Sequence, residues 1–335
     1  MRFSLRLNND QPVSTYIQLA KLAEEVGFDQ FWISNDLFLR SAAAILPAVA
    51  LATKRIEIGS CIFNPYTINP AEIAMFAATM DELSGNRFNL GLSAGASDFL
   101  HWVGLEQQRP LTAVRDTIIA IRALLAGERT TVPSHFLPWN EEAYLRFEAP
   151  RVTPIYIGAL GPKMLQLSGE LADGVLPLLF PPEHYFGVEP LVAQGLANRP
   201  SKLSALDFAA CIWVSLADDA SAARQVLAEK VAYYGYALSP LILERLGLTV
   251  SDFDDVRQAV VDENNLAKAA TLVDDRMLKI GVMGQPSDLI KRLEPLVDAG
   301  VTHLSFGPPL GPNLEKAVYL LGDVITYFKG NVLSS

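Results

Sequence analysis

The amino-acid sequence predicts a parallel α/β fold whose strands close into an eight-stranded (β/α)8 barrel, a TIM barrel. Apolar runs alternate with helical segments along the chain, and most runs are continuous, as in parallel strands that are covered on both faces. A chain of 335 residues, 50% of them hydrophobic, can bury the core of such a barrel. The competing doubly wound sheet would have a glycine-rich turn after its first strand, whereas residues 7–12 read LNNDQP.

Four strand-helix units are predicted up to Leu125. The apolar runs place strands at Phe3–Leu7, Phe31–Ile33, Ile56–Phe63 and Phe88–Leu92. Helical periodicity and the positions of Gly and Pro place helices at Pro12–Val26, Ser41–Thr53, Pro70–Leu83 and Pro110–Leu125.

The remaining strands are predicted at Ile155–Ile157, Val175–Leu179, Phe208–Leu216 and Thr302–Phe306, with helices at Pro162–Leu171 and Asn313–Phe328. Residues 127–151 are rich in Pro, Trp and Glu and are interpreted as an inserted loop. The stretch from Asp219 to Met277 is mostly helical and longer than one barrel helix requires. We therefore expect residues 1–335 to form a single barrel domain with an inserted loop at 127–151 and a helical insertion at 219–285.

Composition excludes several function classes. The formal charge is 27 − 37 = −10 without a concentrated basic segment, which argues against nucleic acid as a partner. No apolar stretch is long enough to span a membrane, and the first residues lack the apolar block of a secretory signal. Two cysteines and scattered histidines give no disulfide framework and no metal-ligand spacing. A reduced, cytoplasmic protein without a metal site is expected.

The ends of the predicted strands supply the candidate site, because active sites of such barrels lie at the C-terminal ends of the strands. The residues at these ends are Arg6, Asn35, Asp36, Cys61, Ile62, Asn64, Ser93, Ala94, Gly95, Ala96, Gly158, Ala159, Leu160, Gly161 and Pro162. Most are amides, hydroxyls or small residues, and few are acids, bases or nucleophiles. This chemistry suits a planar cofactor whose own ring reacts while the protein orients it.

The turn Gly158-Ala159-Leu160-Gly161-Pro162 opens a predicted helix. Free backbone N–H groups and the positive end of the helix attract phosphate at such a turn. A tight connection between strand and helix that binds nothing explains the same residues, so both interpretations remain open.

Several other candidates have an ordinary structural alternative. Asp36 is a possible general acid or a hydrogen-bond partner of a ring, but it is also placed to cap the helix Ser41–Thr53. Cys61 lies in an apolar run, where a small core residue is more common than a nucleophile. The pairs Asn64-Pro65 and Asn69-Pro70 are typical of turns.

Three further segments have no assigned chemical role. Residues 81–87, DELSGNR, are predicted to end a helix and turn into strand four, without a catalytic role. Arg115 and Asp116 either pair locally or support the rim of the site. His101 and Trp102 either wall a pocket or lie on a surface loop.

The order of these motifs resembles the bacterial-luciferase-like flavin and deazaflavin oxidoreductases, in particular the methylenetetrahydromethanopterin reductase branch. The matching segments run along nearly the whole chain: LAEEVGFDQFWIS (22–34), NPYTINPAEIA (64–74), TMDELSGNRFNLGL (79–92), RPLTAVRD (109–116), IYIGALGPKMLQLSGELADGVL (155–176) and GPPLGPNLEKAVYLLGDVI (307–325).

The resemblance implies a TIM barrel, usually a homodimer, that binds FMN or the deazaflavin coenzyme F420 at the strand ends. In the reductase branch a non-prolyl cis peptide at the end of strand three supports the ring, and the equivalent bond here is Cys61–Ile62. The phosphate-side contacts of the family correspond to Gly158–Pro162, and the ring-side contacts correspond to Ser93–Ser97.

The chain departs from the reductase branch at three positions. Asn35-Asp36 stands where these relatives commonly have Asp-His, Arg6 stands where they have an acidic residue, and Cys61 stands where they have Gly. The resemblance therefore implies the fold and the cofactor class more strongly than the substrate.

The sequence and the resemblance thus predict a luciferase-like oxidoreductase that transfers a hydride between reduced F420, or a reduced flavin, and a small organic substrate. A pterin-type one-carbon carrier is one candidate substrate. Asn35, Asp36 and Asn64 would position the ring, and Asp36 or Arg6 would handle a proton or an anionic substrate. The first alternative is an FMN-dependent two-component monooxygenase that works with a separate flavin reductase (a separate F420 reductase is the corresponding partner in the deazaflavin case). The alternative of another class is a non-catalytic protein that binds the cofactor.

Overall fold

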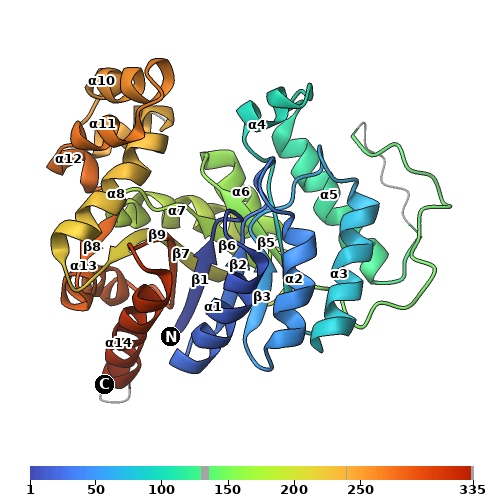
Figure 1. Cartoon of the computed structure of the whole chain (residues 1–335). Helices are drawn as coiled ribbons and strands as arrows, with labels where there is room; N and C mark the ends of the chain where they lie inside the picture. Colours follow the sequence, from blue (N-terminus) through green and yellow to red (C-terminus); the bar gives the residue numbers. More distant parts are fainter. Residues whose placement is uncertain (130–135, 239, 333–335) are drawn as a thin grey trace.

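The computed structural model describes residues 1–129, 136–238 and 240–332, and eight parallel strands of these residues form a closed barrel (Figure 1). The ring runs β1 (Arg2–Leu7), β2 (Gln30–Ile33), β3 (Glu57–Ser60), β4 (Phe88–Leu92), β5 (Ile155–Ala159), β6 (Gly174–Pro177), β7 (Asp207–Leu216) and β9 (His303–Leu310). Pairings of β6 with β7 and of β9 with β1 close it. The predicted fold class is confirmed.

A further strand, β8 (Val282–Gly284), lies outside this ring. It pairs in parallel with the last residues of β7, where Val214 is aligned with Val282 and Leu216 with Gly284. The sequence analysis did not predict this strand at the end of the insertion 219–285. A run of three strand residues is too short to produce a readable period.

Helices surround the barrel. Those that follow the first five strands are α1 (Val13–Val26), α2 (Ala42–Ala52), α3 (Pro70–Ser84), α4 (Ser97–Trp102), α5 (Pro110–Leu125) and α6 (Pro162–Leu171). The rest are α7 (Tyr185–Leu196), α8 (Ala220–Tyr234), α9 (Pro240–Arg245), α10 (Asp254–Arg257), α11 (Leu266–Thr271), α12 (Asp275–Leu278), α13 (Pro286–Asp298) and α14 (Leu314–Val332). Figure 1 shows α10, α11 and α12 gathered beyond α8, on the side away from α2 and α3.

Three local predictions need correction. The helices α4 and α7 were not expected, and the small-residue loop after β4 ends at Ser97, where α4 begins. Strand three stops at Ser60, not at Phe63, which makes only an isolated bridge to Leu92. Strand six is β6, Gly174–Pro177, whereas Val175–Leu179 was expected. Of the predicted loop 127–151, residues 130–135 lie outside the described residues, and the described remainder has no helix or strand.

The inside of the barrel is polar at the N-terminal ends of the strands. Arg2 forms ion pairs with Glu57 at 2.7 Å and with Asp207 at 2.9 Å. The carboxylate of Glu57 also accepts from Gln30, and that of Asp207 accepts from the hydroxyl of Tyr156. Above this layer the ring of Trp32 packs against that of Tyr156, with centroids 4.9 Å apart. These layers close the barrel below, so a ligand has access only from the C-terminal ends of the strands.

The segment 81–87, which ends α3, has the structural role that its sequence predicts. Gly85 ends the helix with φ at 68°, a left-handed conformation that glycine adopts at low cost. The buried carboxylate of Asp81 accepts from Thr153 Oγ1 at 2.6 Å and from Arg151 Nη2 at 2.9 Å. Asp81 thereby ties α3 to the residues that lead into β5.

Asp81→Ala is expected to lower the free energy of unfolding by about 3 kcal/mol, because it leaves the Arg151 guanidinium and the Thr153 hydroxyl without their shared acceptor. Urea denaturation measures the loss. Glu82→Ala, at the exposed neighbouring position, is the control and should change stability by less than about 0.5 kcal/mol. Equal stabilities of the two variants would contradict the role assigned to Asp81.

Candidate active site

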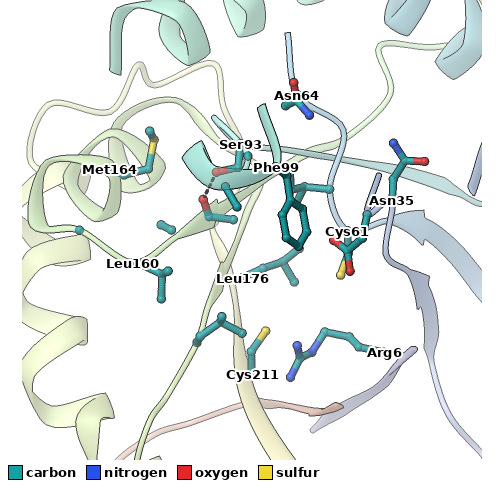
Figure 2. A pocket seen from close by; sticks show the side chains of 18 of the residues that line it. Arg6, Asn35, Cys61, Asn64, Ser93, Phe99, Leu160, Met164, Leu176 and Cys211 are labelled. Atoms are coloured by element: carbon teal, nitrogen blue, oxygen red, sulfur yellow. Dashed lines mark hydrogen bonds between the residues drawn. The ribbon is translucent and has the colours of Figure 1, made fainter. Parts of the chain in front are cut away.

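A cavity of about 390 Å³ opens at the C-terminal ends of the barrel strands (Figure 2). Its lining combines residues from every predicted strand end from β1 to β5 with residues that were not predicted. The lining residues are Arg6, Asn35, Asp36, Leu37, Cys61, Ile62, Asn64, Ser93, Gly95, Ala96, Phe99, Leu100, Gly158, Ala159, Leu160, Gly161, Met164, Leu176, Leu178 and Cys211. Of the predicted site residues, only Ala94 and Pro162 are not part of this lining.

The end of β3 forms one wall of the cavity. The peptide bond Cys61–Ile62 is cis, as the resemblance implied. Gly91 in β4 lies so close to Ser60, the residue before Cys61, that an added Cβ would overlap the carbonyl oxygen of Ser60. Ser60 and Gly91 also hydrogen-bond to each other, from Gly91 N to Ser60 Oγ at 3.1 Å and from Ser60 Oγ to Gly91 O at 3.2 Å. The position of this wall therefore depends on a glycine at 91.

Asn35 and Asp36 follow β2, and the first has a structural role whereas the second is available for chemistry. The side-chain oxygen of Asn35 accepts from the backbone N–H of Ala42 at 3.2 Å, so Asn35, and not Asp36, serves the start of α2. Asp36 lines the cavity, and its carboxyl group is not needed for the start of α2. Burial raises the pKa of Asp36, while Lys230 opposes the rise and Asp10 adds to it. A carboxyl group with a raised pKa suits proton transfer better than an ordinary one.

The oxygen and the nitrogen of the Asn64 side-chain amide have different roles, one in the turn and one in the site. Its Oδ1 accepts from Tyr66 N at 3.1 Å, Thr67 N at 3.0 Å and Thr67 Oγ1 at 3.1 Å. This is the turn chemistry expected of an Asn-Pro pair. The oxygen is therefore fully used, and the Nδ2 donor, for which no hydrogen bond occurs within the described residues, remains for a ligand. Asn69 has only a structural role, because its side chain caps α3.

The glycine turn after β5 faces the same cavity. Ser93 Oγ donates to the carbonyl oxygen of Gly158 at 2.8 Å and joins β4 to the turn (Figure 2). The backbone N–H groups of Leu160 and Gly161 make no hydrogen bond within the part of the chain that the structure describes. Gly161 also precedes the first turn of α6 as its N-cap residue. Unpaired N–H groups beside the positive end of a helix are suited to a phosphate group.

Arg6 lies on the floor of the cavity. The side chain is buried, and its Nε donates to Ser305 Oγ at 3.0 Å. The thiols of Cys61 and Cys211 line the cavity with it. Burial raises the pKa of Cys61 to about 12 and also raises that of Cys211, so both thiols are neutral at physiological pH. This excludes a thiolate nucleophile at Cys61, in agreement with the structural interpretation of that residue.

Part of the apolar lining was missed by the sequence analysis. Phe99 and Leu100 come from the unexpected α4, Met164 comes from α6, and Cys211 comes from β7. Only Cys211 had a readable signal, since inward positions of a strand alternate. Trp102, a candidate wall residue, is instead 57% exposed and stacks on Phe99 with centroids 4.6 Å apart. Arg115 binds Glu170 of α6 through two hydrogen bonds, which makes it a link between helices.

A second cavity, of about 370 Å³, also lies at this end of the barrel, between the ends of β1 and β9 and the helix α8. Lys230 of α8 lines it, with its ammonium group 4.1 Å from the ring centroid of Tyr234 and 5.1 Å from that of Trp213. Burial lowers the pKa of Lys230 to about 8, although Asp36 and Asp10 oppose the shift and Arg6 adds to it. The sequence pattern did not single out this lysine.

Lys230→Met is expected to stabilise the protein by about 1 kcal/mol or more at pH 7, because it removes a buried ammonium group. The folded protein releases this proton at lower pH than the unfolded chain, so the cost is fully present below about pH 8 and disappears towards pH 10.5. The gain in Tm should therefore shrink over this range. Lys291→Met, at an exposed position, should show no such pH dependence. A gain that is constant with pH would contradict the assigned burial cost.

Neither a cluster of metal-ligating side chains nor a helix able to cross a membrane occurs among the described residues. They contain no group of three or more His, Cys, Asp or Glu side chains that could hold a metal ion. Among their helices, none has both the length and the apolar composition needed to cross a membrane.

Comparisons with known proteins agree with this geometry. The family model described as luciferase-like monooxygenase matches residues 1–303. A 5,10-methylenetetrahydromethanopterin reductase of Methanolobus tindarius is 34% identical over 326 residues, covering 97% of this chain and 99% of the relative. The enzyme of the same name from Archaeoglobus fulgidus is 34% identical over 329 residues, covering 97% and 98%. The solved structure of the coenzyme F420 dependent tetrahydromethanopterin reductase from Methanopyrus kandleri superposes with a TM-score of 0.89 at 28% identity, covering 98% of this chain and 99% of that one. The chain belongs to the luciferase-like monooxygenase family.

Proposed function

We propose that this protein is an F420-dependent oxidoreductase that transfers a hydride between the reduced coenzyme and a small organic substrate. The observation that carries the proposal is the arrangement of one cavity between the end of β3 at Cys61–Ile62 and the glycine turn 158–161. Relatives whose names specify coenzyme F420 support the choice of cofactor, among them the Methanopyrus kandleri enzyme.

The residues present fit this cofactor. The cavity is large enough for a planar ring system, and its polar lining groups are mostly neutral hydrogen-bonding groups. Asn64 Nδ2 and the wall at Cys61–Ile62 would hold the ring, and the N–H groups of Leu160 and Gly161 would bind its phosphate. When bound, the deazaflavin ring supplies the hydride chemistry. Asp36 would hold or release the accompanying proton.

A pterin-type one-carbon carrier is a candidate substrate, because relatives named as methylenetetrahydromethanopterin reductases are 34% identical over nearly the whole chain. The homodimer, the separate F420 reductase and the cytoplasmic location expected from the sequence stay predictions. So do the division into one domain with two insertions and the assignment of individual site residues.

Titration of the purified apoprotein with F420 and, separately, with FMN tests the proposal. Fluorescence quenching and native mass should show binding of F420 with at least tenfold preference over FMN. Preference for FMN would favour the two-component monooxygenase instead, and oxygen consumption with a flavin reductase would then be measured. Binding of neither cofactor would contradict both functions.

A further inference from the structure

The floor of the cavity holds a buried cation without a carboxylate partner. Arg6 is only 5% exposed, and none of the ion pairs formed by the described residues includes it. Its hydrogen bonds go to neutral oxygens: Nε to Ser305 Oγ at 3.0 Å, and Nη2 to the carbonyls of Ile212 at 3.3 Å and Ser305 at 3.4 Å. Burying an isolated charge is costly unless a counter-charge arrives.

The guanidinium group keeps donors available for a ligand. Nη1 makes no hydrogen bond within the described part of the chain, and Arg6 is part of the cavity lining. Figure 2 shows its side chain below Cys61 and Leu176, pointing towards Cys211. The neighbouring thiols are neutral and supply no counter-charge. The two N–H groups on Nη1 are therefore the unused donors of this floor.

The remaining lining supplies no negative charge at ion-pair distance. Among the described residues, Arg6 and Asp36 are the only charged side chains of this lining, and they form no ion pair with each other. One uncompensated positive charge calls for a monoanion, and a single planar guanidinium suits a carboxylate. A dianionic phosphate would find only this one cation among the lining residues.

The guanidinium group of Arg6 is also held in position by hydrogen bonds to residues that do not line the cavity. Ser305, which accepts from Arg6, accepts in addition from Ser4 Oγ at 2.7 Å, and Ser4 lies 3.0 Å from His303 Nε2. His303 in turn contacts Asp207 through Nδ1 at 2.9 Å. Gly307 of β9 provides the space, because an added Cβ would overlap the guanidinium of Arg6. A fixed, desolvated donor of this kind is typical of a binding residue.

We propose that Arg6 forms an anion-binding subsite that receives a carboxylate group of the substrate. The inference rests on the proposed function and deepens it, since it names the substrate class for the same cavity: small carboxylic acids in their anionic form. The other source of this chemistry is an anionic group of the cofactor, and the experiment separates the two.

The test measures binding of propionate and of its neutral counterpart propionamide by ligand-observed NMR, with apoprotein and with protein loaded with oxidised F420. Wild-type protein in both forms should bind propionate at least tenfold more tightly than propionamide. Arg6→Met should weaken propionate binding by about 10- to 100-fold and leave propionamide and F420 binding within about threefold. Arg55→Met, at an exposed position, is the matched control and should behave as wild type.

A second variant guards against a folding defect of Arg6→Met. Gly307→Ala keeps the charge but displaces the guanidinium, so it should also lose the preference for propionate. Wild-type protein that binds propionate no better than propionamide would overturn the inference. If the same protein binds F420, the proposed function still stands. An Arg6→Met protein that loses F420 affinity but keeps propionate binding would overturn it too and assign Arg6 to the cofactor.

Discussion

Asp36→Asn is expected to lower kcat by about 10²- to 10⁴-fold, the usual contribution of a general acid or base. Asp36 is the only acidic side chain that the described part of the chain contributes to the cavity lining, and burial raises its pKa. The asparagine has nearly the same size but carries no exchangeable carboxyl proton. The affinity for F420 should stay within about threefold, because Asp36 is not needed to start α2, which uses Asn35.

Steady-state kinetics over a pH series measure this effect once a substrate is available. The raised pKa places one limb of the wild-type pH profile above the ordinary range of Asp, and that limb should be absent from the variant. Asp98→Asn, an exposed acid in α4, serves as the control and should keep the wild-type profile. A kcat within threefold of wild type would remove Asp36 from the chemistry.

Gly91→Ala is expected to reduce F420 affinity by at least 100-fold. The added Cβ would overlap the carbonyl oxygen of Ser60 and would also lie only 3.1 Å from the carbonyl carbon of Ser60. Since β3 and β4 cannot separate without losing their ladder, the backbone before Ile62 must move, and with it the wall proposed to support the ring. Fluorescence titration with F420 measures the loss.

The matched control is Gly330→Ala in α14, where an added Cβ meets nothing within 4 Å and affinity should be unchanged. Ser60→Ala is the milder test, because it removes the two hydrogen bonds to Gly91 without adding an atom. We expect it to weaken F420 binding by about tenfold. A folded Gly91→Ala protein with wild-type affinity would show that the cofactor does not rest on this wall.

The barrel could be predicted because continuous apolar runs and helical periods are properties of the local sequence. The misses have physical causes. β8 has three residues and exists only through its pairing with β7. The short helix α4 follows a segment of small residues whose composition is typical of a loop. Strand three ends at Ser60 because the chain turns away there, although its apolar residues continue to Phe63. Tertiary contacts decided each case.

The candidate site was predicted in outline because the ends of parallel strands must meet at one end of a barrel. The roles within it depend on partners that are distant in sequence. Asn35 and Asp36 are adjacent and similar in size, but only the structure shows that the side-chain oxygen of Asn35 accepts a hydrogen bond from Ala42 N. The isolation of Arg6 depends on Ser305 and Gly307, about 300 positions away along the chain, and no local pattern contains that information.

The attachment of β8 has a consequence for how this protein can change. The hydrogen-bonded ring is complete without it, and among the described residues β8 pairs with the barrel along the last three residues of β7. Insertions, deletions or replacements in that segment would reshape the second cavity around Lys230 while leaving the wall at Cys61–Ile62 and the turn at 158–161 in place. Grafting α8–α12 from a relative is therefore a route to a new substrate range on an unchanged redox centre.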